Sequence, residues 1–424
     1  MTQPAAQSAP RAAFAPLTGR RVLEWCSYAA GPMVGKILAA LGADVIKIEA
    51  PLVGDEARAA GPFLNNEPDP ETSALYLYLN NGKRSVTLDP TTADGRRIFL
   101  RLLDWADLLV EDRAPALMEQ TDLTYATLAQ AKPGLVMLSI TPFGQTGPNR
   151  DLKIYPSQTS HAGGAAYSQP NGFLYEPEVG IPPTQWPRLV SEYSAGTEAA
   201  FGALAALLAK DMTGQGQHID LSKQESQMHP IRTELDSYPN EGIVRKRQNA
   251  PRPAGTIDRF SISGTMACAD GYVTLWPLVS YMPANLVEWL GNPTWSQEAR
   301  WTDVEQRQNF STEFRGLVME GLLPHTKADI YDGLQAKNVS VAPVYSAEEV
   351  LRGRQNTFRQ FFHTVQDPDA GALPYATLPF KLSTAADPTP GVAPRLGQHN
   401  QEVLAGMLGL TSEELTTLHA QRVV

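Results

Sequence analysis

Short apolar stretches alternate with amphipathic ones through the first third of the chain. Five short runs of apolar and β-branched residues have the length of buried strands, and they lie at residues 21–25, 44–49, 83–89, 107–111 and 134–144. Between them, apolar residues at helical spacing predict helices at residues 28–42, 94–106 and 123–132. Strands separated by helices of this length are typical of βαβ units. The pattern therefore predicts an α/β fold with a parallel sheet and right-handed crossovers.

The periodicity fades beyond Gly147. Residues 149–190 are rich in Pro, Gly and polar residues and predict a long loop, and loops of such length in compact domains are usually functional. From Gln224 to Glu320 the pattern is interrupted by Pro, and we expect a separate, smaller domain there. The remaining expected elements are helices at 191–210, 329–338, 346–355 and 411–421, the last with a capping box at Thr411 and Glu414, and strands at 218–222, 271–276 and 339–345.

Composition narrows the class of protein. The chain has 424 residues, enough for about two or three domains. Its 35 Lys and Arg against 45 Asp and Glu give a net charge of −10, which argues against the broad phosphate contacts of nucleic-acid-binding proteins. Two distant cysteines suggest neither a disulfide framework nor a zinc cluster. The N-terminus lacks a secretory signal, and the longest apolar run, 199–209, is too short for a membrane span. We expect a cytoplasmic protein that binds neither nucleic acid nor membrane.

Several motifs allow both a structural and a functional interpretation. The segment Gly31–Lys36 is one residue short of a nucleotide-binding phosphate loop, although a helix that begins at Pro32 after a strand presents free N–H groups to an anion. None of the seven histidines pairs at metal-ligand spacing, so no metal site is predicted. His161 is the histidine that we consider as a site residue. Lys83-Arg84 and the Lys153–Tyr155 segment either hold a phosphate or cap a solvated edge.

Glu192 stands where the long predicted loop enters a helix of small residues. A carboxylate in the first turn stabilises a helix by about 0.3–1 kcal/mol through the helix dipole, which is the structural interpretation. The functional interpretation is a carboxylate nucleophile at a helix start, packed closely by Ala195 and Gly196. The residues by themselves leave both interpretations open.

Ten short segments occur in a fixed order along the chain. They are YAAGP, LGADVIKIEAP, NNGKRSVTLD, ADLLVED, SITPFGQTGP, GGAA, SEYSAG, TGQGQHIDLS, ADGYVTL and APRLGQHNQEVL. The series closely resembles family III CoA-transferases (the CaiB/BaiF group, which includes formyl-CoA transferases). The resemblance extends from Leu17 to Val424, and ten segments in order are far more specific than any one of them.

The resemblance implies a Rossmann-like large domain built from both chain ends, a smaller domain from the middle, and an interlocked dimer of threaded subunits. We accordingly expect a flexible tail at 1–17, the first part of the large domain at 18–224, the small domain at 225–330 and the return to the large domain at 331–424. It also implies CoA transfer from an acyl-CoA to a carboxylic acid, with no permanently bound cofactor. In that chemistry an enzyme carboxylate attacks the thioester, forms a mixed anhydride and then becomes a thioester to CoA.

Most site residues follow from the resemblance position by position. Ala29, Ala30 and Gly31 match the first loop of the family, Lys153 and Tyr155 fall on positions that line the CoA site, and Gly163 and Gly164 match the glycine pair of the active-site loop, which would also hold His161. We add four residues to the predicted CoA-binding set: Lys83 and Arg84 as cations at a strand entrance, and Asp112 and Arg113 as the residues that stand at a site position of the family. Glu192 occupies the position of the family's nucleophilic Asp. Its added methylene displaces the carboxylate by about 1.5 Å, and a misplacement of about 1 Å can cost about 10²-fold in rate. Asp112-Arg113 replaces the family's Asn and aromatic residue.

Three functions therefore stay open at the level of sequence. The chain either transfers CoA, alone or as one subunit of a heteromeric enzyme, or it is a degenerate structural subunit that partners an active paralogue. The third is an acyl-CoA racemase, isomerase or lyase of the same fold, in which His161 and Glu192 would have to serve as acid and base on opposite faces of a carbon.

Overall fold

The computed structural model describes residues 15–167, 189–242, 264–276, 281–302, 310–385 and 390–424. These residues form two compact units. The first unit holds the described parts of Met1–Ala166, Gln185–Arg232 and Gln355–Val424, and the second those of Tyr167–Thr184 and Thr233–Arg354. The domain boundaries expected from the sequence stay predictions, and most of the expected tail at 1–17 lies outside the described residues.

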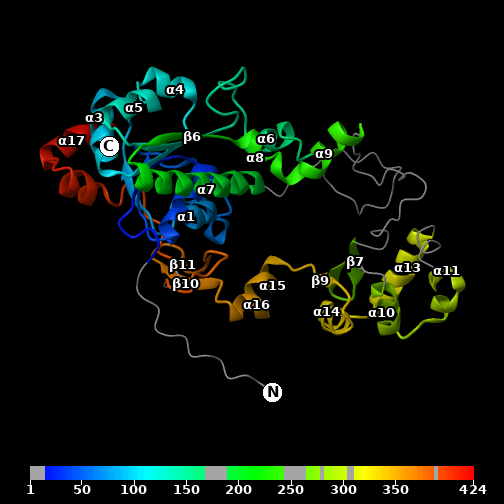
Figure 1. The fold of residues 1–424 in the computed structure, drawn as a ribbon. Coiled ribbons are helices and arrows are strands. Elements are labelled where there is room, and N and C mark those ends of the chain that lie inside the picture. The colour runs from blue at the N-terminus through cyan, green and yellow to red at the C-terminus, as the bar shows by residue number, and fades with distance from the viewer. Residues whose placement is uncertain (1–14, 168–188, 243–263, 277–280, 303–309, 386–389) are drawn as a thin grey trace. The chain divides into compact units, whose positions relative to one another are not determined.

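Six parallel strands form the central sheet of the first unit (Figure 1). They are β1 (Arg21–Trp25), β2 (Asp44–Glu49), β3 (Arg84–Thr87), β4 (Leu108–Glu111), β5 (Val136–Thr141) and β6 (Gln217–Ser222). Their order in the sheet is β3-β2-β1-β4-β5-β6, and all neighbouring pairs are parallel. Each strand falls on a run that the sequence predicts as a strand, so the predicted α/β fold with a parallel sheet is confirmed.

Alternating side chains of the strands fill two cores, one on each face of the sheet. Leu23 and Ile46 pack on one face with the helices α3 (Ala93–Trp105), α5 (Tyr125–Ala131) and α17 (Ser412–Ala420). Val22 and Val45 pack on the other face with α1 (Ala30–Ala40) and α7 (Val190–Thr213). The two faces are both apolar because parallel strands covered by helices on both sides have no solvated face. In Figure 1, α1 and α7 accordingly lie together, with the sheet between them and α3 and α5.

The helices of the first unit connect these strands. They are α1 (Ala30–Ala40), η1 (Glu56–Ala59), η2 (Leu64–Asn66), α2 (Ala74–Asn80), α3 (Ala93–Trp105), α4 (Pro115–Gln120), α5 (Tyr125–Ala131), α6 (Pro156–Ala162), α7 (Val190–Thr213), α8 (Lys223–Ser226) and η3 (His229–Ile231). One expectation was wrong, because α6 lies inside the segment 149–190 that the sequence predicts as loop. Its polar residues carry no apolar period, although Pro156 stands at the first helical position, where proline favours a helix start.

The C-terminal part of the chain returns to the edge of this sheet. An antiparallel hairpin of β10 (Phe362–Asp367) and β11 (Gly371–Ala376) follows α16 (Arg354–Phe358). The backbone of His399 then donates to the carbonyl of Ser85 in β3, at 2.9 Å. The π-helix η5 (Gln401–Met407) and α17 (Ser412–Ala420) complete the unit, and the predicted capping box of Thr411 and Glu414 is present.

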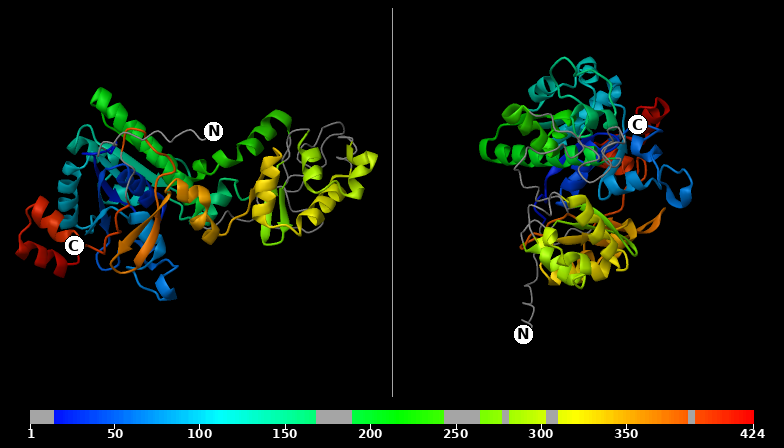
Figure 2. Two further views of the ribbon diagram at one scale, coloured as in Figure 1. Left: turned by 90° about the horizontal axis from the view of Figure 1, so that it is seen from below. Right: turned by 90° about the vertical axis from the view of Figure 1, so that its right-hand side faces the viewer.

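The second unit is built around a small antiparallel sheet of order β7-β8-β9. Its elements are α9 (Arg232–Glu241, whose first residue belongs to the first unit), β7 (Gly264–Cys268), β8 (Gly271–Leu275), α10 (Met282–Trp289), η4 (Thr294–Gln297), α11 (Ala299–Thr302), α13 (Ser311–Leu322), α14 (Lys327–Ala336), β9 (Val341–Pro343) and α15 (Ala347–Arg352). Val273 and Phe314, both 0% exposed, centre the core between sheet and helices. Figure 2 shows these helices, yellow-green to yellow, beside the short sheet. Among the described helices, none is long and apolar enough to cross a bilayer.

Candidate active site

The sheet order reverses between β1 and β4, and the loops that leave these two strands meet. Ligands of open α/β sheets bind at such a switch point, at the carboxyl ends of the strands. Ser27 follows β1, and its backbone N–H donates to the Asp112 carboxylate, which follows β4, at 2.9 Å. The side chain of Arg113 pairs with the same carboxylate. Burial alone would lower the pKa of Arg113, but Asp112 together with smaller contributions from Cys26 and Glu111 raises it above its usual range.

The loop that begins α1 lies against the same point. Ala29, Ala30 and Gly31 are buried, and a Cβ atom at Gly31 would lie 2.4 Å from Cβ of Cys26 and 3.4 Å from Oδ2 of Asp112. The structure therefore brings together two groups of predicted residues that are about 80 positions apart in sequence, Ala29–Gly31 and Asp112-Arg113.

Glu192 reaches this point because the start of α7 packs closely on the start of α1. At Gly196 a Cβ atom would lie 2.5 Å from the carbonyl oxygen of Ala30 and 2.7 Å from Cβ of Met33, so only glycine permits this approach. Glu192, one helical turn earlier, is 1% exposed. Its Oε2 accepts a hydrogen bond from Nζ of Lys223 at 2.7 Å.

Lys223 comes from the carboxyl end of β6, where it is the first residue of α8. Its side chain is 17% exposed. Burial acts to lower the pKa of Lys223, but the adjacent Glu192 carboxylate, with smaller contributions from Asp112 and Cys26, raises it above the usual range. Cys26 follows β1 and Asp112 follows β4, and both are close enough to Lys223 to affect its pKa. The Glu192–Lys223 pair therefore lies at the same end of the sheet as the β1 and β4 loops.

The end of α6 is held against the start of α7 by α8. Amide groups of α8 and the following turn bind both helices: Gln224 donates to the carbonyl of Ala162 at 3.0 Å, and Gln227 to that of Ser191 at 3.1 Å. At Gly163 a Cβ would lie 2.6 Å from Cβ of Gln227, so the glycine allows this contact. The predicted glycine pair, Gly163 with Gly164, therefore lies beside the helix that carries Glu192.

Three predicted residues of α6 and its approach are exposed. Tyr155, the residue before the helix, is 75% exposed, and Lys153 is exposed as well. The His161 ring is exposed, with Nδ1 2.5 Å from the carbonyl oxygen of Ser157. All three side chains are therefore accessible to a ligand.

Lys83 and Arg84 are consecutive, but their side chains lie in different places. The Lys83 ammonium is buried, contacts Glu24 Oε2 at 2.8 Å and donates to the carbonyl of Pro32 in the first turn of α1 at 2.8 Å. Burial lowers the pKa of Lys83 to about 8, with Glu24 acting in the opposite direction. Arg84 starts β3 at the amino end of the sheet, where it pairs with Asp44 at 2.6 Å and Glu402 at 2.7 Å. Both cations are thus bound by carboxylates of the chain, and their assignment to CoA stays a prediction.

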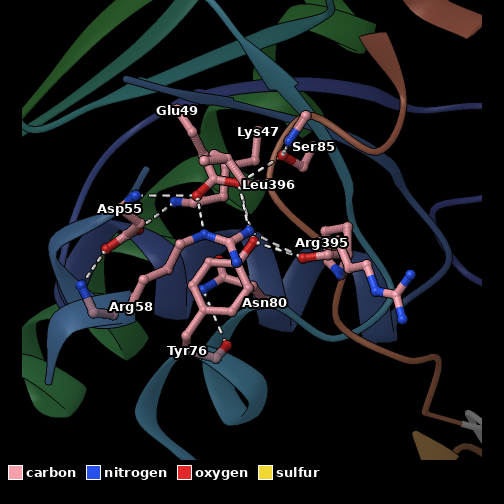
Figure 3. Close-up of polar contacts among 12 residues, drawn as sticks. Lys47, Glu49, Asp55, Arg58, Tyr76, Asn80, Ser85, Arg395 and Leu396 are labelled. Carbon is pink, nitrogen blue, oxygen red and sulfur yellow. Dashed lines mark hydrogen bonds and ion pairs between the residues drawn. The ribbon is translucent and has the colours of Figure 1, made fainter. Parts of the chain in front are cut away.

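Lys83 belongs to what we call the buried charge network, which comprises Glu24, Lys47, Glu49, Asp55, Arg58 and Lys83. Lys47 contacts Glu24 at 2.9 Å and Asp55 at 2.6 Å, and Arg58 donates to both oxygens of Glu49 at 2.7 and 3.0 Å. Figure 3 shows the part around Glu49, with the ring of Tyr76 against the Arg58 guanidinium. The network lies at the carboxyl ends of β1 and β2, where Glu24 and Glu49 stand. It also contacts the β1 loop, because Asp55 accepts a hydrogen bond from the backbone N–H of Tyr28.

Sequence reasoning missed two residues of the site. Glu111, the last residue of β4, is fully buried, and burial raises its pKa to about 7. Hydrogen bonding from Ser139 and then from the backbone N–H of Arg113, at 2.7 Å, acts in the opposite direction. Ile219, Leu221 and Lys223 are alternate positions, and all three are half-buried. A lysine in line with two apolar residues was therefore a signal of a partly buried charge that the sequence offered. Its partner is 31 residues away, so the pairing itself has no local signal. Within the described residues, no group of three or more His, Cys, Asp or Glu is arranged to hold a metal ion.

Comparison with known proteins identifies the fold and the family. The model of CoA-transferase family III matches residues 17–400. The chain is 32% identical to the succinyl-CoA:(R)-benzylsuccinate CoA-transferase subunit BbsE of Thauera aromatica, over 88% of this chain and 90% of that one. It is 30% identical to the succinyl-CoA–D-citramalate CoA-transferase of Chloroflexus aurantiacus, over 96% and 98%. The crystal structure of a CaiB/BaiF family protein from Brucella suis matches with a TM-score of 0.80 and 25% identity, over 93% and 99%. The resemblance drawn from the ten segments is confirmed.

Proposed function

The chain belongs to CoA-transferase family III, and we propose that it moves CoA from an acyl-CoA donor to a carboxylic acid through the carboxylate of Glu192. The observation that carries the proposal is the placement of Glu192. Its carboxylate is removed from solvent at the carboxyl end of the sheet, where the β1 and β4 loops meet, and it is paired with an ammonium group. Ligands of this sheet topology bind at that end.

The reaction exchanges one thioester for another and consumes no external energy source. A Glu192 oxygen attacks the thioester carbonyl carbon, the C–S bond breaks, and the sulfur leaves with the electron pair as CoA thiolate. The thiolate then attacks the Glu192 carbonyl carbon of the anhydride and releases the donor acid as a carboxylate. The acceptor carboxylate attacks the resulting glutamyl thioester, and the thiolate returns to the new anhydride to give the product acyl-CoA. Coenzyme A is thus a substrate, and no permanent cofactor is needed.

The surrounding residues have distinct roles in this proposal. Ala29–Gly31 and Asp112-Arg113 form the floor against which the pantetheine chain and thioester lie, and Lys153 and Tyr155 supply exposed contacts for the nucleotide end. Gly163 and Gly164 allow the end of α6 to approach the reacting carbons, and this end of the helix then excludes water from them. The exposed His161 lies on the solvent side of α6. Because the two named relatives both use succinyl-CoA, we propose a dicarboxylic acyl-CoA as donor.

The test is detection of CoA transfer and of an adduct on Glu192. The purified chain is incubated with succinyl-CoA and a panel of carboxylic acids, new acyl-CoA is measured by liquid chromatography and mass spectrometry, and the peptide that contains Glu192 is examined for acyl or CoA mass. Glu192→Gln removes the nucleophile and should abolish transfer. Glu198→Gln, on the same helix but paired with His229 at the surface, is the matched control and should retain transfer. Full activity of Glu192→Gln contradicts the proposal.

A second candidate is a structural subunit that completes an active paralogue, and two observations favour it. Glu192 is closed in by its ion pair with Lys223, and the relative from Thauera aromatica is named as a subunit. In this case the isolated chain forms no adduct, and turnover appears only when the paralogue is present. An acyl-CoA racemase, isomerase or lyase activity would instead appear as deuterium exchange or elimination without transfer.

The surface of α7 supports assembly with a second family III chain. Three large apolar residues at helical spacing, Phe201, Leu208 and Met212, are 76%, 61% and 79% exposed. Such a row is typical of a helix that packs on a further partner. We propose that two chains, identical or paralogous, interlock and cover it. Native mass spectrometry of the protein from its own host distinguishes a homodimer from a heterodimer, and Leu208→Glu should weaken either one.

A further inference from the structure

We propose that Lys223 is the charge partner of the transfer: its ammonium holds the Glu192 carboxylate before reaction and the CoA thiolate after Glu192 has been acylated. The proposal rests on the proposed function of Glu192 and adds a second residue with a defined role. Nothing in the ten family-like segments singles out this lysine, which lies directly after the last residue of TGQGQHIDLS.

The geometry restricts the glutamate to one arrangement. A Glu side chain has one more rotatable bond than the Asp it replaces, and a nucleophile has to be held within a fraction of an ångström. The ammonium of Lys223, which lies between β6 and α8 in the chain, holds Oε2 of Glu192 at 2.7 Å. Glu192 is 1% exposed and Lys223 17%, so little water competes for either group.

The other charged and titratable groups near Lys223 already have partners or are neutral. Asp112 is bound by the Arg113 side chain and by the backbone N–H of Ser27. Burial, and then the charges of Asp112 and Glu24, keep the pKa of the Cys26 thiol well above its usual range, so the thiol carries no charge at neutral pH. The charge of Lys223 is therefore balanced chiefly by Glu192.

Acylation removes that balance. When a Glu192 oxygen bonds to the acyl carbon, the carboxylate loses its negative charge, and the same unit of charge appears on the CoA sulfur as the C–S bond breaks. No proton moves and the total charge is constant. A partly buried ammonium without a counter-charge is costly, so Lys223 favours a state in which the thiolate stays beside it. The thiolate is then retained for its attack on the glutamyl carbonyl carbon.

Three substitutions test this role. Lys223→Met removes the charge and keeps most of the volume, Lys223→Gln keeps a hydrogen-bond donor for Glu192 without the charge, and Lys223→Arg keeps the charge. We expect kcat to fall by about 10²- to 10³-fold in the first two, the size of effect seen when one charge-stabilising donor is removed, and to recover substantially in Lys223→Arg. KM for the acyl-CoA should change by less than about threefold, because uniform binding is not affected.

Rescue by the conservative variant separates this role from a merely structural one. A structural role depends on side-chain volume, which Lys223→Met keeps, whereas the proposed role depends on charge, so kcat should fall in Lys223→Met and Lys223→Gln with little change in KM and return in Lys223→Arg. Lys210→Met, at the far end of α7, is the matched control and should leave kcat unchanged.

The outcomes are distinguishable from failure of the proposed function. If Glu192→Gln abolishes transfer while Lys223→Gln keeps the kcat of the unchanged chain, the role of Lys223 is rejected and that of Glu192 stands. If Glu192→Gln transfers CoA at full rate, the proposed function itself is rejected. Loss of kcat in both neutral variants without recovery in Lys223→Arg also overturns the proposal.

Discussion

The buried charge network and the Glu192–Lys223 pair are made of the same kinds of group but differ in how their charges are held. In the network, Arg58 donates to both oxygens of Glu49, to Glu71 and to the carbonyl of Pro394, a residue 336 positions away in sequence. In the pair, within the described part of the chain, Lys223 forms one ion pair, with Glu192. The network is enclosed, whereas the pair lies where the strands end.

The difference separates charges that hold the fold from charges that are available for reaction. A buried ion with several partners keeps its position when any single contact lengthens, and it ties distant segments together. A pair held by one contact can exchange a partner at the cost of that contact alone. Substitutions in the network should therefore change stability, and substitutions at the pair should change activity.

The largest effect on stability is expected from Arg58→Leu. The substitution leaves Glu49 buried without its cation and removes the link to Pro394, and breaking a buried ion pair costs about 3–5 kcal/mol. Urea denaturation measures the change in the free energy of unfolding. Arg395→Leu is the matched control: Arg395 also makes a bidentate pair, with Asp369, but its side chain is 56% exposed, and water screens such a pair, so we expect a much smaller loss of stability. Equal losses in the two variants would remove the distinction between network and surface pairs.

The next effect concerns Glu111, a buried carboxyl group whose pKa is raised to about 7. Because the folded state binds this proton more tightly than the unfolded state, Glu111 lowers stability as pH rises from about 4.5 to about 7, by up to about 3 kcal/mol. Glu111→Gln removes this dependence. The variant should gain stability relative to the unchanged chain at pH 8 and show little gain at pH 5, measured by urea denaturation at both values. A gain of the same size at both pH values would show that Glu111 is not protonated in the folded state near neutral pH.

Much of the first unit could be predicted from the sequence because its signals are local. Buried parallel strands such as Val136–Thr141 are short apolar runs wherever they occur, and the capping box of Thr411 and Glu414 lies within one helical turn. The helix α6 was missed because its residues, Pro156–Ala162, are almost all polar or small, and its stability comes from packing on α7 and α8.

The site was predictable only in part. Glu192, Ala29–Gly31 and Asp112-Arg113 were named through the resemblance, and the structure brings the two loops together. Lys83 was named as a cation at a strand entrance, where the sequence cannot distinguish a ligand contact from the ion pair with Glu24 that the structure contains. Lys223 was missed because its partner is brought to it by tertiary packing alone.

Gly196→Ala tests how far the position of Glu192 depends on helix packing. The new Cβ would lie 2.5 Å from the Ala30 carbonyl oxygen, so α7 has to move away from α1. Overpacking of this kind costs about 1–3 kcal/mol, and a shift of about 1 Å at Glu192 costs about 10²-fold in kcat. Gly202→Ala on the same helix is the control, because its Cβ meets only Ile219 at 3.4 Å, an ordinary contact. If both variants keep kcat, the close contact at Gly196 does not position the nucleophile.

The smallest effect is expected from Arg84→Ala. Arg84 pairs with Asp44 and Glu402 at the amino end of β3, so we expect a loss of at most about 1 kcal/mol and a KM for acyl-CoA within about twofold of that of the unchanged chain. Arg113→Ala, at the carboxyl end of β4, should raise KM well beyond that range, because it removes a cation from the loop that meets the β1 loop. The ratio of the two KM values from steady-state kinetics places the bound acyl-CoA at one end of the sheet. A tenfold rise in Arg84→Ala would instead support the sequence-based assignment of Arg84 to CoA, and it would mean that a cation with two carboxylate partners can still serve the ligand.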